Sequence, residues 1–203
     1  MRKTKEEAEI TRQKLLKAAL AVFSRMGYAD TRLEDIAQEA GVTRGAIYHH
    51  FGSKVELYNI LVAEAFGRVQ PVIDAVIASG GTPLQVLRRL FVKVLLFSVQ
   101  DPDFRAVQEI VLFKTAITPE LAEGIQRKAE GSRQMVDWLA GMMTAAKGAG
   151  DLRADLDPRL GAVSFLAFQN GILTQWLFDS ELFSIAQSAE AFADIFIRGI
   201  SAP

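Results

Sequence analysis

Two adjacent histidines, His49 and His50, are the first residues of this chain that suggest reactive chemistry. They are the only histidines of the sequence, and they follow Arg44 and Tyr48 in the stretch GVTRGAIYHHF, residues 41–51. Successive side chains on a helix point about 100° apart, so the two imidazoles are poorly placed to bind one metal ion. A metal site or a catalytic pair is therefore disfavoured, and a surface that contacts another molecule is the alternative.

The rest of the chain offers little for catalysis. It has no cysteine, which excludes disulfides, thiolate metal ligands and thiol nucleophiles, and it contains neither a phosphate-binding loop nor a nucleophile elbow. The 203 residues are half hydrophobic and carry a net charge of −1, so overall charge does not indicate nucleic acid. We predict a protein that is not an enzyme and needs no metal or cofactor. The charged start MRKTKEEAEI lacks the apolar region of a signal peptide, so we expect a cytoplasmic protein.

A charge-free segment, residues 160–178, tests the expectation of a soluble protein. It approaches the length of a membrane span, but Gln169, Asn170, Gln175 and two glycines interrupt it. A helix that is apolar on all sides can also be buried inside a larger helical protein. We favour burial, and we expect no membrane partner.

The positions of the prolines predict an all-α protein. Four of the six prolines directly follow Thr or Asp, at residues 82–83, 101–102, 118–119 and 157–158. A Thr or Asp side chain can accept a hydrogen bond from the free amides of a helix start, and proline suits the first helical position. Between these points the patterns are helical. About nine helices are predicted, over residues 6–26, 33–40, 43–50, 54–78, 83–99, 103–115, 119–146, 158–178 and 186–200.

The short segments 33–40 and 43–50 have the pattern of a helix-turn-helix unit. Thr31 and Glu34 have capping-box spacing, which predicts a helix start, and Gly41 stands where this helix ends. Two helices this short are marginal alone, so the preceding helix is expected to complete a three-helix head. In such a unit the second short helix enters the major groove of DNA.

The second short helix carries side chains that suit this contact. Thr43 and the free amides at the helix start can bind a phosphate, and Arg44 can donate two parallel hydrogen bonds to a guanine. Gly45 and Ala46 keep the front of the helix slim enough to approach the bases. Residues 1–67 hold ten Lys or Arg against nine Asp or Glu, so the basic side chains must gather on one face. Further donors at the distance of the DNA backbone are offered by Tyr48, His49, His50 and Lys54.

Residues 31–62, TRLEDIAQEAGVTRGAIYHHFGSKVELYNILV, resemble the DNA-binding domain of TetR-family transcriptional regulators, with GVTRGAIY, HF and SK at the family spacing. Segments 2–20 and 160–178 more particularly resemble AcrR-type repressors of multidrug efflux genes. We divide the chain into a DNA-binding domain, 1–53, and a ligand-binding and dimerisation domain, 54–203. The resemblance implies DNA-facing positions at Arg32, Leu33, Arg44, Gly45, Ala46, Tyr48, His49, His50 and Lys54. The basic start RKTK is either a frayed tail or an arm that reaches DNA.

The two C-terminal helices are predicted to form a dimer interface. The segment 186–200 has an apolar stripe opposite a charged face, and the helix 158–178, which is charge-free from residue 160 onward, is apolar beyond the needs of one core-facing side. Because a single helix-turn-helix domain makes few contacts with bases, we expect a twofold homodimer on a near-palindromic operator. Small residues that let another helix approach are Gly161, Ala162, Ala167 and Gly171. The interface is assigned to Gly171, Phe192, Phe196 and Ile200.

The middle of the chain is rich in aromatic residues, which suit either ordinary core packing or a pocket for a flat apolar ligand. Two neutral polar residues in apolar helices, Gln108 and Asn170, favour the pocket, and the resemblance places both near positions that AcrR-like proteins use for ligands. The helix over 54–78, which Pro71 can kink, would link the ligand-binding part to the head. Ligand binding is assigned to Phe91, Gln108, Phe113, Trp138, Phe168 and Asn170.

These features predict a ligand-responsive transcriptional regulator. We expect a repressor whose partners are double-stranded operator DNA, a second copy of the chain and a small, planar, apolar effector that releases the operator. One alternative is a helical lipid- or partner-binding protein whose head does not bind DNA. Another is a regulator with a filled core that responds to no ligand.

Overall fold

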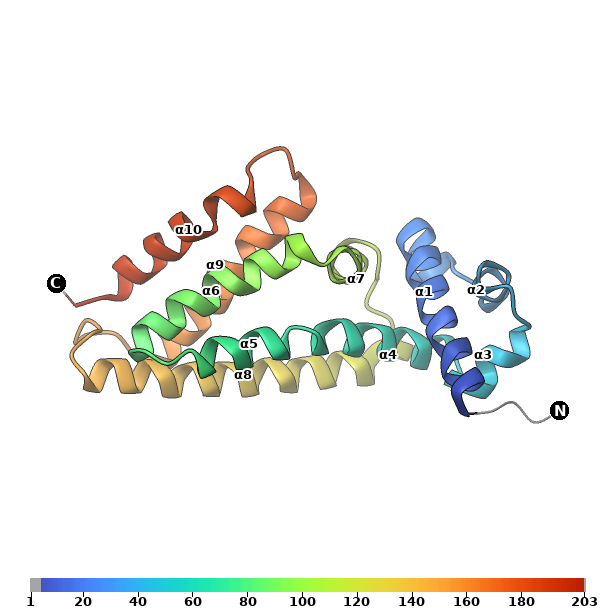
Figure 1. Cartoon of the computed structure of the whole chain (residues 1–203), viewed down its shortest axis with the longest axis horizontal. Helices are drawn as coiled ribbons and strands as arrows, with labels where there is room; N and C mark the ends of the chain where they lie inside the picture. The colour runs from blue at the N-terminus through green and yellow to red at the C-terminus, as the bar shows by residue number, and fades with distance from the viewer. Residues whose placement is uncertain (1–4, 203) are drawn as a thin grey trace. The chain divides into compact units, whose positions relative to one another are not determined.

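The computed structural model describes residues 5–202, and these residues form an all-α protein (Figure 1). A single isolated β-bridge, between Leu152 and Ser201, is the β-type pairing found in them. The predicted fold class is confirmed. The elements in chain order are α1 (Lys5–Asp30), α2 (Leu33–Ala40), α3 (Arg44–Phe51), α4 (Lys54–Gly67), α5 (Gln70–Ala78), α6 (Pro83–Gln100), α7 (Pro102–Phe113), the 3-10 helix η1 (Pro119–Leu121), α8 (Ala122–Gly148), α9 (Pro158–Phe178) and α10 (Ile185–Ile200).

The chain forms two compact units that do not follow chain order. The first unit combines Met1–Gly67 with Asp103–Gly124, and the second combines Arg68–Pro102 with Ile125–Pro203. The segment from α7 to the start of α8 therefore belongs to the unit that contains the helix-turn-helix. The domain division after residue 53 stays a prediction. Residues 2–4 of the basic start lie outside the described part of the chain.

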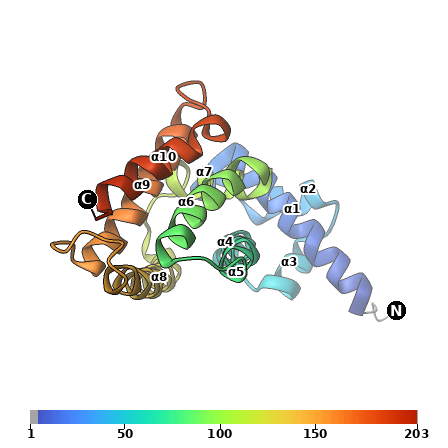
Figure 2. The same ribbon diagram turned by 60° about the vertical axis from the view of Figure 1, so that its left-hand side comes forward.

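The head of the first unit is formed by the long helix α1 and the short helices α2 and α3 (Figure 2). Helix α1 packs against α2 and α4, and α3 packs against α2 and α4. Leu15, Ala19, Val22 and Phe23 of α1 recur at helical spacing and are all buried, so this helix supplies one wall of the head. The fully buried apolar side chains of this bundle include Leu15, Val22, Phe23, Ile36, Ile47 and Leu57.

Helix α2 begins at Leu33 as predicted, but the predicted capping box is wrong. The carboxylate of Asp35 accepts a hydrogen bond from the backbone N–H of Arg32 at 2.9 Å, so the cap lies one residue further along. Thr31 instead donates its hydroxyl to the carbonyl of Gly27 at 2.6 Å. Gly27 has φ 76° and interrupts the regular geometry of α1, which leaves its carbonyl available to this hydroxyl.

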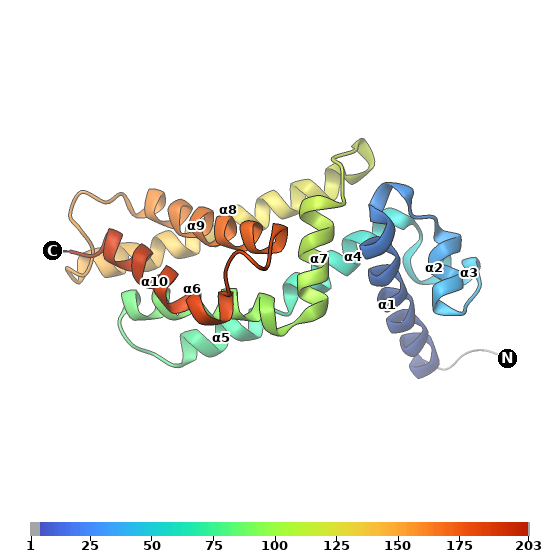
Figure 3. The ribbon, with the colours of Figure 1, turned by 90° about the horizontal axis from the view of Figure 1, so that it is seen from above.

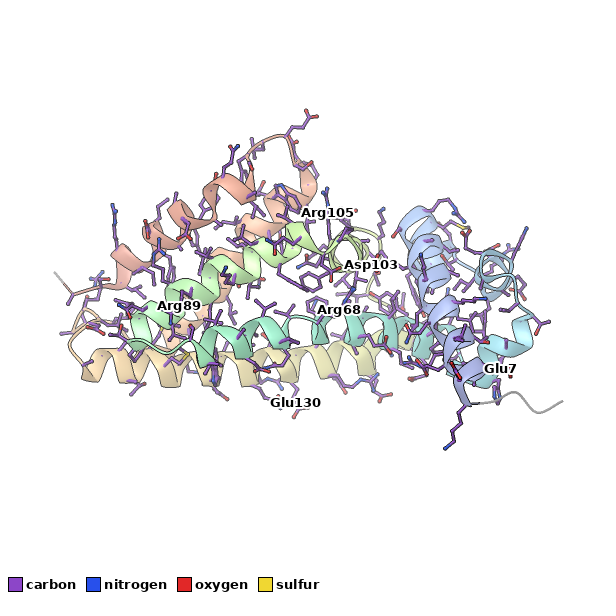
Figure 4. The ribbon with its side chains drawn as sticks, viewed as in Figure 1. Glu7, Arg68, Arg89, Asp103, Arg105 and Glu130 are labelled. Atoms are coloured by element: carbon purple, nitrogen blue, oxygen red, sulfur yellow. The ribbon has the colours of Figure 1, made fainter. Side chains whose placement is uncertain are left out.

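The second unit contains α5, α6, most of α8, α9 and α10. Helix α6 packs against α5, α9 and α10 (Figure 3). Two Thr/Asp–Pro pairs of this unit cap helices as predicted: Thr82 accepts from the backbone N–H of Gln85 at 3.3 Å, and Asp157 from that of Leu160 at 2.8 Å. Helix α8 buries Leu139 and Met143 and exposes polar residues such as Glu130 on its other side (Figure 4).

The single helix predicted over 54–78 is wrong, because the structure has two helices there. Helix α4 ends at Gly67, and α5 starts at Gln70 with Pro71 in its first turn. Proline has no backbone N–H to donate, and its ring collides with the carbonyl four residues earlier in a continuous helix. For Pro71 that carbonyl belongs to Gly67. The proline therefore ends one helix and begins the next rather than bending a single one.

Helix α9, which carries no charge after Arg159, is buried along one side. Ala162, Phe165, Gln169 and Trp176 are buried on that side at helical spacing. Across residues 5–202, no helix has both the length and the hydropathy that a membrane span requires.

Candidate nucleic-acid interface

Helix α3 divides its side chains between the core and solvent. Ile47 is 0% exposed and Phe51 is 5% exposed, so the apolar side of the helix faces the head. Arg44, Tyr48 and His49 are exposed. The other predicted DNA-facing residues that are exposed are Arg32, Thr43 and Gly45, and those that are half-buried are Ala46, His50 and Lys54.

Leu33 differs from the other predicted DNA-facing residues. Its side chain is buried in the core of the head, as are those of Ile36 and Ala37 in the same helix. The reason is that Leu33 is the first residue of the apolar face of α2 and lies three residues before Ile36. The structure thus gives Leu33 a packing role.

The turn between α2 and α3 needs glycine. Gly41 has φ 66° and ψ 34°, in the left-handed region where a side chain is strained. The backbone N–H of Val42 donates to the carbonyl of Ala37 at 2.9 Å, which closes the end of α2. Ala37 and Ile47 are both buried, so a small residue and an aliphatic one pack where the two helices meet. The predicted end of α2 at Gly41 is confirmed.

Arg44 is held on the surface of the head by two partners. Its Nη2 donates to the hydroxyl of Tyr48 at 2.6 Å, and the guanidinium lies 5.2 Å from the centre of the Tyr48 ring. Its Nη1 forms an ion pair with Oε1 of Glu34, which belongs to α2. The hydrogen bond to Tyr48 and the charge of Glu34 raise the pKa of Arg44 above its ordinary value, so the guanidinium stays charged. Glu34 was missed by the sequence reasoning, which used it as a helix cap.

Lys54 binds the end of α1. Its ammonium donates to the backbone carbonyls of Tyr28 at 3.0 Å, Thr31 at 3.1 Å and Ala29 at 3.4 Å, and lies 4.4 Å from the centre of the Tyr28 ring. The last carbonyls of a helix have no partner within the helix, and a cation near them is favourable. Lys54 therefore ties the start of α4 to the end of α1. Its contact with DNA stays a prediction.

Replacing Lys54 by Met is expected to lower the free energy of unfolding by about 1–2 kcal/mol, because three carbonyls lose a charged donor. Thermal denaturation of the variant and of the wild-type protein measures the difference. Lys17→Met is the matched control, since Lys17 is an exposed lysine on α1. Equal melting temperatures for the two variants would contradict the structural role of Lys54.

The two histidines form an aromatic pair. Their ring centres lie 5.2 Å apart with an interplanar angle of 74°. Within residues 5–202, no group of three or more His, Cys, Asp or Glu side chains is arranged to hold a metal ion. The pair belongs to the same helix as Arg44, close to the exposed side that the other polar side chains share.

The apolar stripe of α10 is used largely by the core of the protomer itself. Phe196 is 9% exposed and Ile200 is 7% exposed. The Phe196 ring stacks on Phe91 with centres 6.0 Å apart and on Phe168 with centres 6.1 Å apart. The structure therefore corrects the reason given for this stripe: it packs against its own chain. Of the other two residues assigned to a dimer interface, Phe192 is half-buried and Gly171 is exposed.

Helix α9 also has a second, exposed side that carries no charge. Leu160 is 62% exposed, Val163 is 46% exposed and Phe178 is 78% exposed. Spacings of three and four residues place these side chains on one face, with small and neutral residues between them. The remaining exposed residues of this face are Ser164, Ala167, Asn170, Gly171 and Gln175. We call this set, Leu160 to Phe178, the α9 outer face.

The predicted small residues of α9 divide between its two sides. Ala167 and Gly171 belong to the α9 outer face, as expected for a contact with another helix. Gly161 and Ala162 are buried. A β-carbon on Gly161 would lie 2.6 Å from Sδ of Met143, so this glycine allows α8 to approach within the protomer. A large apolar side chain, Ile195 of α10, is also 61% exposed.

Four phenylalanine rings form an aromatic cluster in the second unit. Phe91 is 0% exposed, and its ring centre lies 5.2 Å from that of Phe165 and 5.7 Å from that of Phe168. The Phe165 and Phe196 rings meet edge to face at 5.5 Å. Of the predicted ligand-binding residues, the structure brings Phe91 and Phe168 together here. Trp138, on α8 in the same unit, is half-buried.

The buried amide of α9 is Gln169 rather than the neighbouring Asn170. Gln169 is 7% exposed, and its Nε2 donates to the backbone carbonyl of Phe91 at 3.0 Å. Asn170 is exposed and belongs to the α9 outer face. The sequence reasoning missed Gln169, although its spacing from Ala162 and Phe165 places it on the buried side of the helix.

The two remaining predicted ligand residues lie on α7, in the first unit. Gln108 is 6% exposed, and its Oε1 has no hydrogen-bond partner among the residues that the structure describes. A buried amide oxygen without a donor is uncommon, because it loses its hydrogen bonds to water without replacement. Phe113, at the end of the same helix, is 46% exposed.

A helix-turn-helix head with a polar, exposed second helix, followed in the same chain by a larger helical unit, defines a DNA-binding transcriptional regulator. A family model described as "Bacterial regulatory proteins, tetR family" matches residues 15–60. Another, described as "MAATS-type transcriptional repressor, C-terminal region", matches residues 82–201. The chain belongs to the TetR family of transcriptional regulators, and the resemblance seen in the sequence is confirmed.

Relatives of known role match over nearly the whole chain. The transcriptional regulator AcrR of Shigella flexneri is 33% identical over 200 residues, which cover 97% of this chain and 92% of that protein. The crystal structure of NalD, the secondary repressor of the MexAB-OprM multidrug efflux pump in Pseudomonas aeruginosa, is similar with a TM-score of 0.86 and 28% identity, covering 97% and 98% of the two chains. A complex of the repressor SmeT with triclosan has a TM-score of 0.78 and 28% identity, covering 95% and 92%.

Proposed function

We propose that this protein is a repressor that binds a near-palindromic operator as a homodimer and leaves it when a small apolar effector binds. The exposed polar side chains of α3 carry this proposal, because Arg44, Tyr48 and His49 are exposed on the second helix of a helix-turn-helix unit while its Ile47 and Phe51 are buried. Membership of the TetR family supports DNA binding. The similarity to NalD and SmeT, which are repressors of efflux pumps, supports repression.

In the proposed complex, α3 enters the major groove. Arg44 supplies the bidentate fork for a guanine, and Gly45 and Ala46 let the front of the helix approach the bases. Tyr48 and the two histidines donate to phosphates. Such contacts fix the register on DNA, whereas Arg44 reads the sequence.

The homodimer would use the α9 outer face. Exposed apolar patches of this kind mark interaction surfaces, and a twofold axis lets the same face contact itself. Gly171 and Ala167 allow the two copies of α9 to approach closely. The exposed Ile195 of α10 extends the apolar surface. The assignment of Phe196 and Ile200 to the interface loses support, because both side chains are buried within the protomer.

The effector would be a planar apolar molecule with a few hydrogen-bonding groups. The aromatic cluster offers ring faces and edges for such a molecule, and the complex of SmeT with triclosan shows that a similar repressor binds a small molecule. Gln108, on α7 in the first unit, is a separate candidate position, because its buried Oε1 has no donor and a polar group of a ligand would supply one. The effector would favour a conformation of the protein that fits DNA less well.

A melting screen with planar aromatic compounds, followed by operator titration with every hit, tests this proposal. A compound at about 100 times its dissociation constant should add roughly 2.7 kcal/mol to the stability of the fold. The same compound should weaken operator binding, because it favours the conformation that fits DNA less well, and by linkage the operator should weaken its binding by the same factor. Gln108→Leu should weaken compounds that carry a donor more than purely apolar ones.

Each other outcome selects an alternative. Hits that leave operator affinity unchanged would mean ligand binding without regulation, and the absence of hits would favour a regulator with a filled core. A wild-type protein that retards no DNA would favour the lipid- or partner-binding alternative.

A further inference from the structure

Both terminal nitrogens of the Arg44 guanidinium have a partner within the protein. Nη1 is paired with the Glu34 carboxylate, and Nη2 donates to the Tyr48 hydroxyl at 2.6 Å. A guanine is read by two parallel N–H donors from the same fork. Each of these nitrogens keeps a second N–H, so the competition concerns the position and charge of the guanidinium rather than its number of donors: a base or phosphate that takes the place at Nη1 has to displace the Glu34 carboxylate.

Of the two partners, Glu34 is the one that competes with DNA by charge. Tyr48 lies on the same helix as Arg44 and is itself a neutral donor for DNA, whereas Glu34 is an anion on α2. Its carboxylate offers Arg44 the same kind of ionic contact that a phosphate offers. A carboxylate beside the reading helix also repels the phosphates that draw the protein to any DNA.

Glu34 is not required for the fold of the head. Its side chain is 54% exposed, and the cap of α2 is provided by Asp35, whose carboxylate accepts from Arg32 N–H at 2.9 Å. An exposed ion pair contributes little to stability, so the contact with Arg44 is not explained by stability. The effect of this ion pair is instead to make Arg44 less available to DNA.

We propose that Glu34 is an intramolecular competitor of DNA for Arg44 and that this competition sets the specificity of operator binding. On non-operator DNA a phosphate offers Arg44 one ionic contact, which is no better than the contact with Glu34, so the arginine stays paired. On the operator a guanine offers two parallel hydrogen bonds, and Arg44 leaves Glu34. The carboxylate thus weakens non-specific binding more than operator binding. This inference rests on the proposed function.

Glu34→Gln tests the inference, with Glu39→Gln as the matched control. Glu39 lies on the same helix, is also exposed, and pairs with Arg25 on α1 rather than with a predicted reading residue. Both changes remove one negative charge. Dissociation constants are measured for the operator and for a random duplex over a range of salt concentrations, and melting temperatures confirm that both variants fold.

Glu34→Gln should raise the affinity for random DNA by about two- to fivefold, the equivalent of an exposed ion pair. The salt slope on random DNA should steepen by about 0.9, because one more cation reaches a phosphate. Operator affinity should rise less, so the ratio of operator to random affinity falls. Glu39→Gln should change both affinities alike and leave the ratio unchanged.

The Arg44→Ala background shows whether the effect passes through Arg44. In that background, Glu34→Gln should change the affinities for operator and random DNA no more than Glu39→Gln does. The inference is overturned if the two variants behave alike in the wild-type background, or if Glu34→Gln lowers operator affinity, which would make Glu34 a residue that orients Arg44. A wild-type protein without preference for any sequence would instead contradict the proposed function itself.

Discussion

Arg44→Ala is expected to weaken operator binding by about 1–3 kcal/mol, or fivefold to 150-fold, and to relax base choice at one position of each half-site. The guanidinium is the group on α3 whose geometry matches the two acceptors of a guanine. Because it is exposed and bonded to Glu34 and Tyr48 at the surface, its removal leaves the core of the head intact. Titration of operator variants with each of the four bases at that position measures both effects.

Arg25→Ala is the control for the loss of a positive charge. Arg25 is an exposed arginine on α1 that pairs with Glu39, away from the exposed side of α3. Arg25→Ala should change the affinity for all DNA sequences alike, and by less than Arg44→Ala does. If Arg44→Ala binds the operator as tightly and as selectively as the wild-type protein, then Arg44 is not the reading residue.

Phe196→Asp is expected to unfold the second unit, at a cost of about 5 kcal/mol or more. Removal of a buried phenylalanine ring leaves a cavity, and the new carboxylate would lie between the rings of Phe91, Phe165 and Phe168 without a charged partner. Chemical denaturation followed by circular dichroism measures the loss. A stable variant with an unchanged denaturation midpoint would contradict the packing of this cluster.

Val163→Asp places the same charge on the α9 outer face and separates assembly from folding. Val163 is 46% exposed in the protomer, so the carboxylate can stay hydrated there, and the protomer should fold. In the dimer the carboxylate would be buried against the partner, and sedimentation at micromolar concentration should show monomers. Operator binding should fall although the head is unchanged. A variant that remains dimeric would exclude the α9 outer face as the interface.

Local signals in the sequence predicted most of the helices. The Thr82–Pro83 and Asp157–Pro158 pairs combine a capping side chain with a residue that fits a helix start, so one position carries two agreeing preferences. The turn at Gly41 is equally local. By contrast, two adjacent carboxylates, Glu34 and Asp35, could cap the start of α2. Thr31 does not pair with Glu34, because its hydroxyl donates to the carbonyl of Gly27. The local spacing of residues does not show this contact.

The errors at α10 and α9 have a different cause. A stripe of apolar residues shows that a helix face is covered, but not whether the covering surface belongs to the same chain, and so Phe196 was assigned to a partner. Gln169 and Asn170 are adjacent, and about 100° of helix rotation separates a buried amide from an exposed one. Helical periodicity, applied from Phe165, would have selected Gln169.

The reading face of α3 was predictable, but the partners of its side chains were not. The periodicity of Ile47 and Phe51 fixes which side faces the core and therefore which side is free. The ionic partner of Arg44, Glu34, comes from α2, and the three carbonyls that bind Lys54 come from the end of α1 and from Thr31 just after it. Such contacts depend on how helices pack, and no spacing within one segment encodes them.

Selection of bound duplexes from a random-sequence pool, followed by sequencing, tests the central claim of operator binding most directly. We expect an enriched inverted repeat whose half-sites lie one helical turn or a multiple of it apart, with a guanine in each half-site. With Arg44→Ala the same selection should lose the preference for that guanine and keep the repeat. A pool with no enriched sequence, or with a single asymmetric site, would contradict the account.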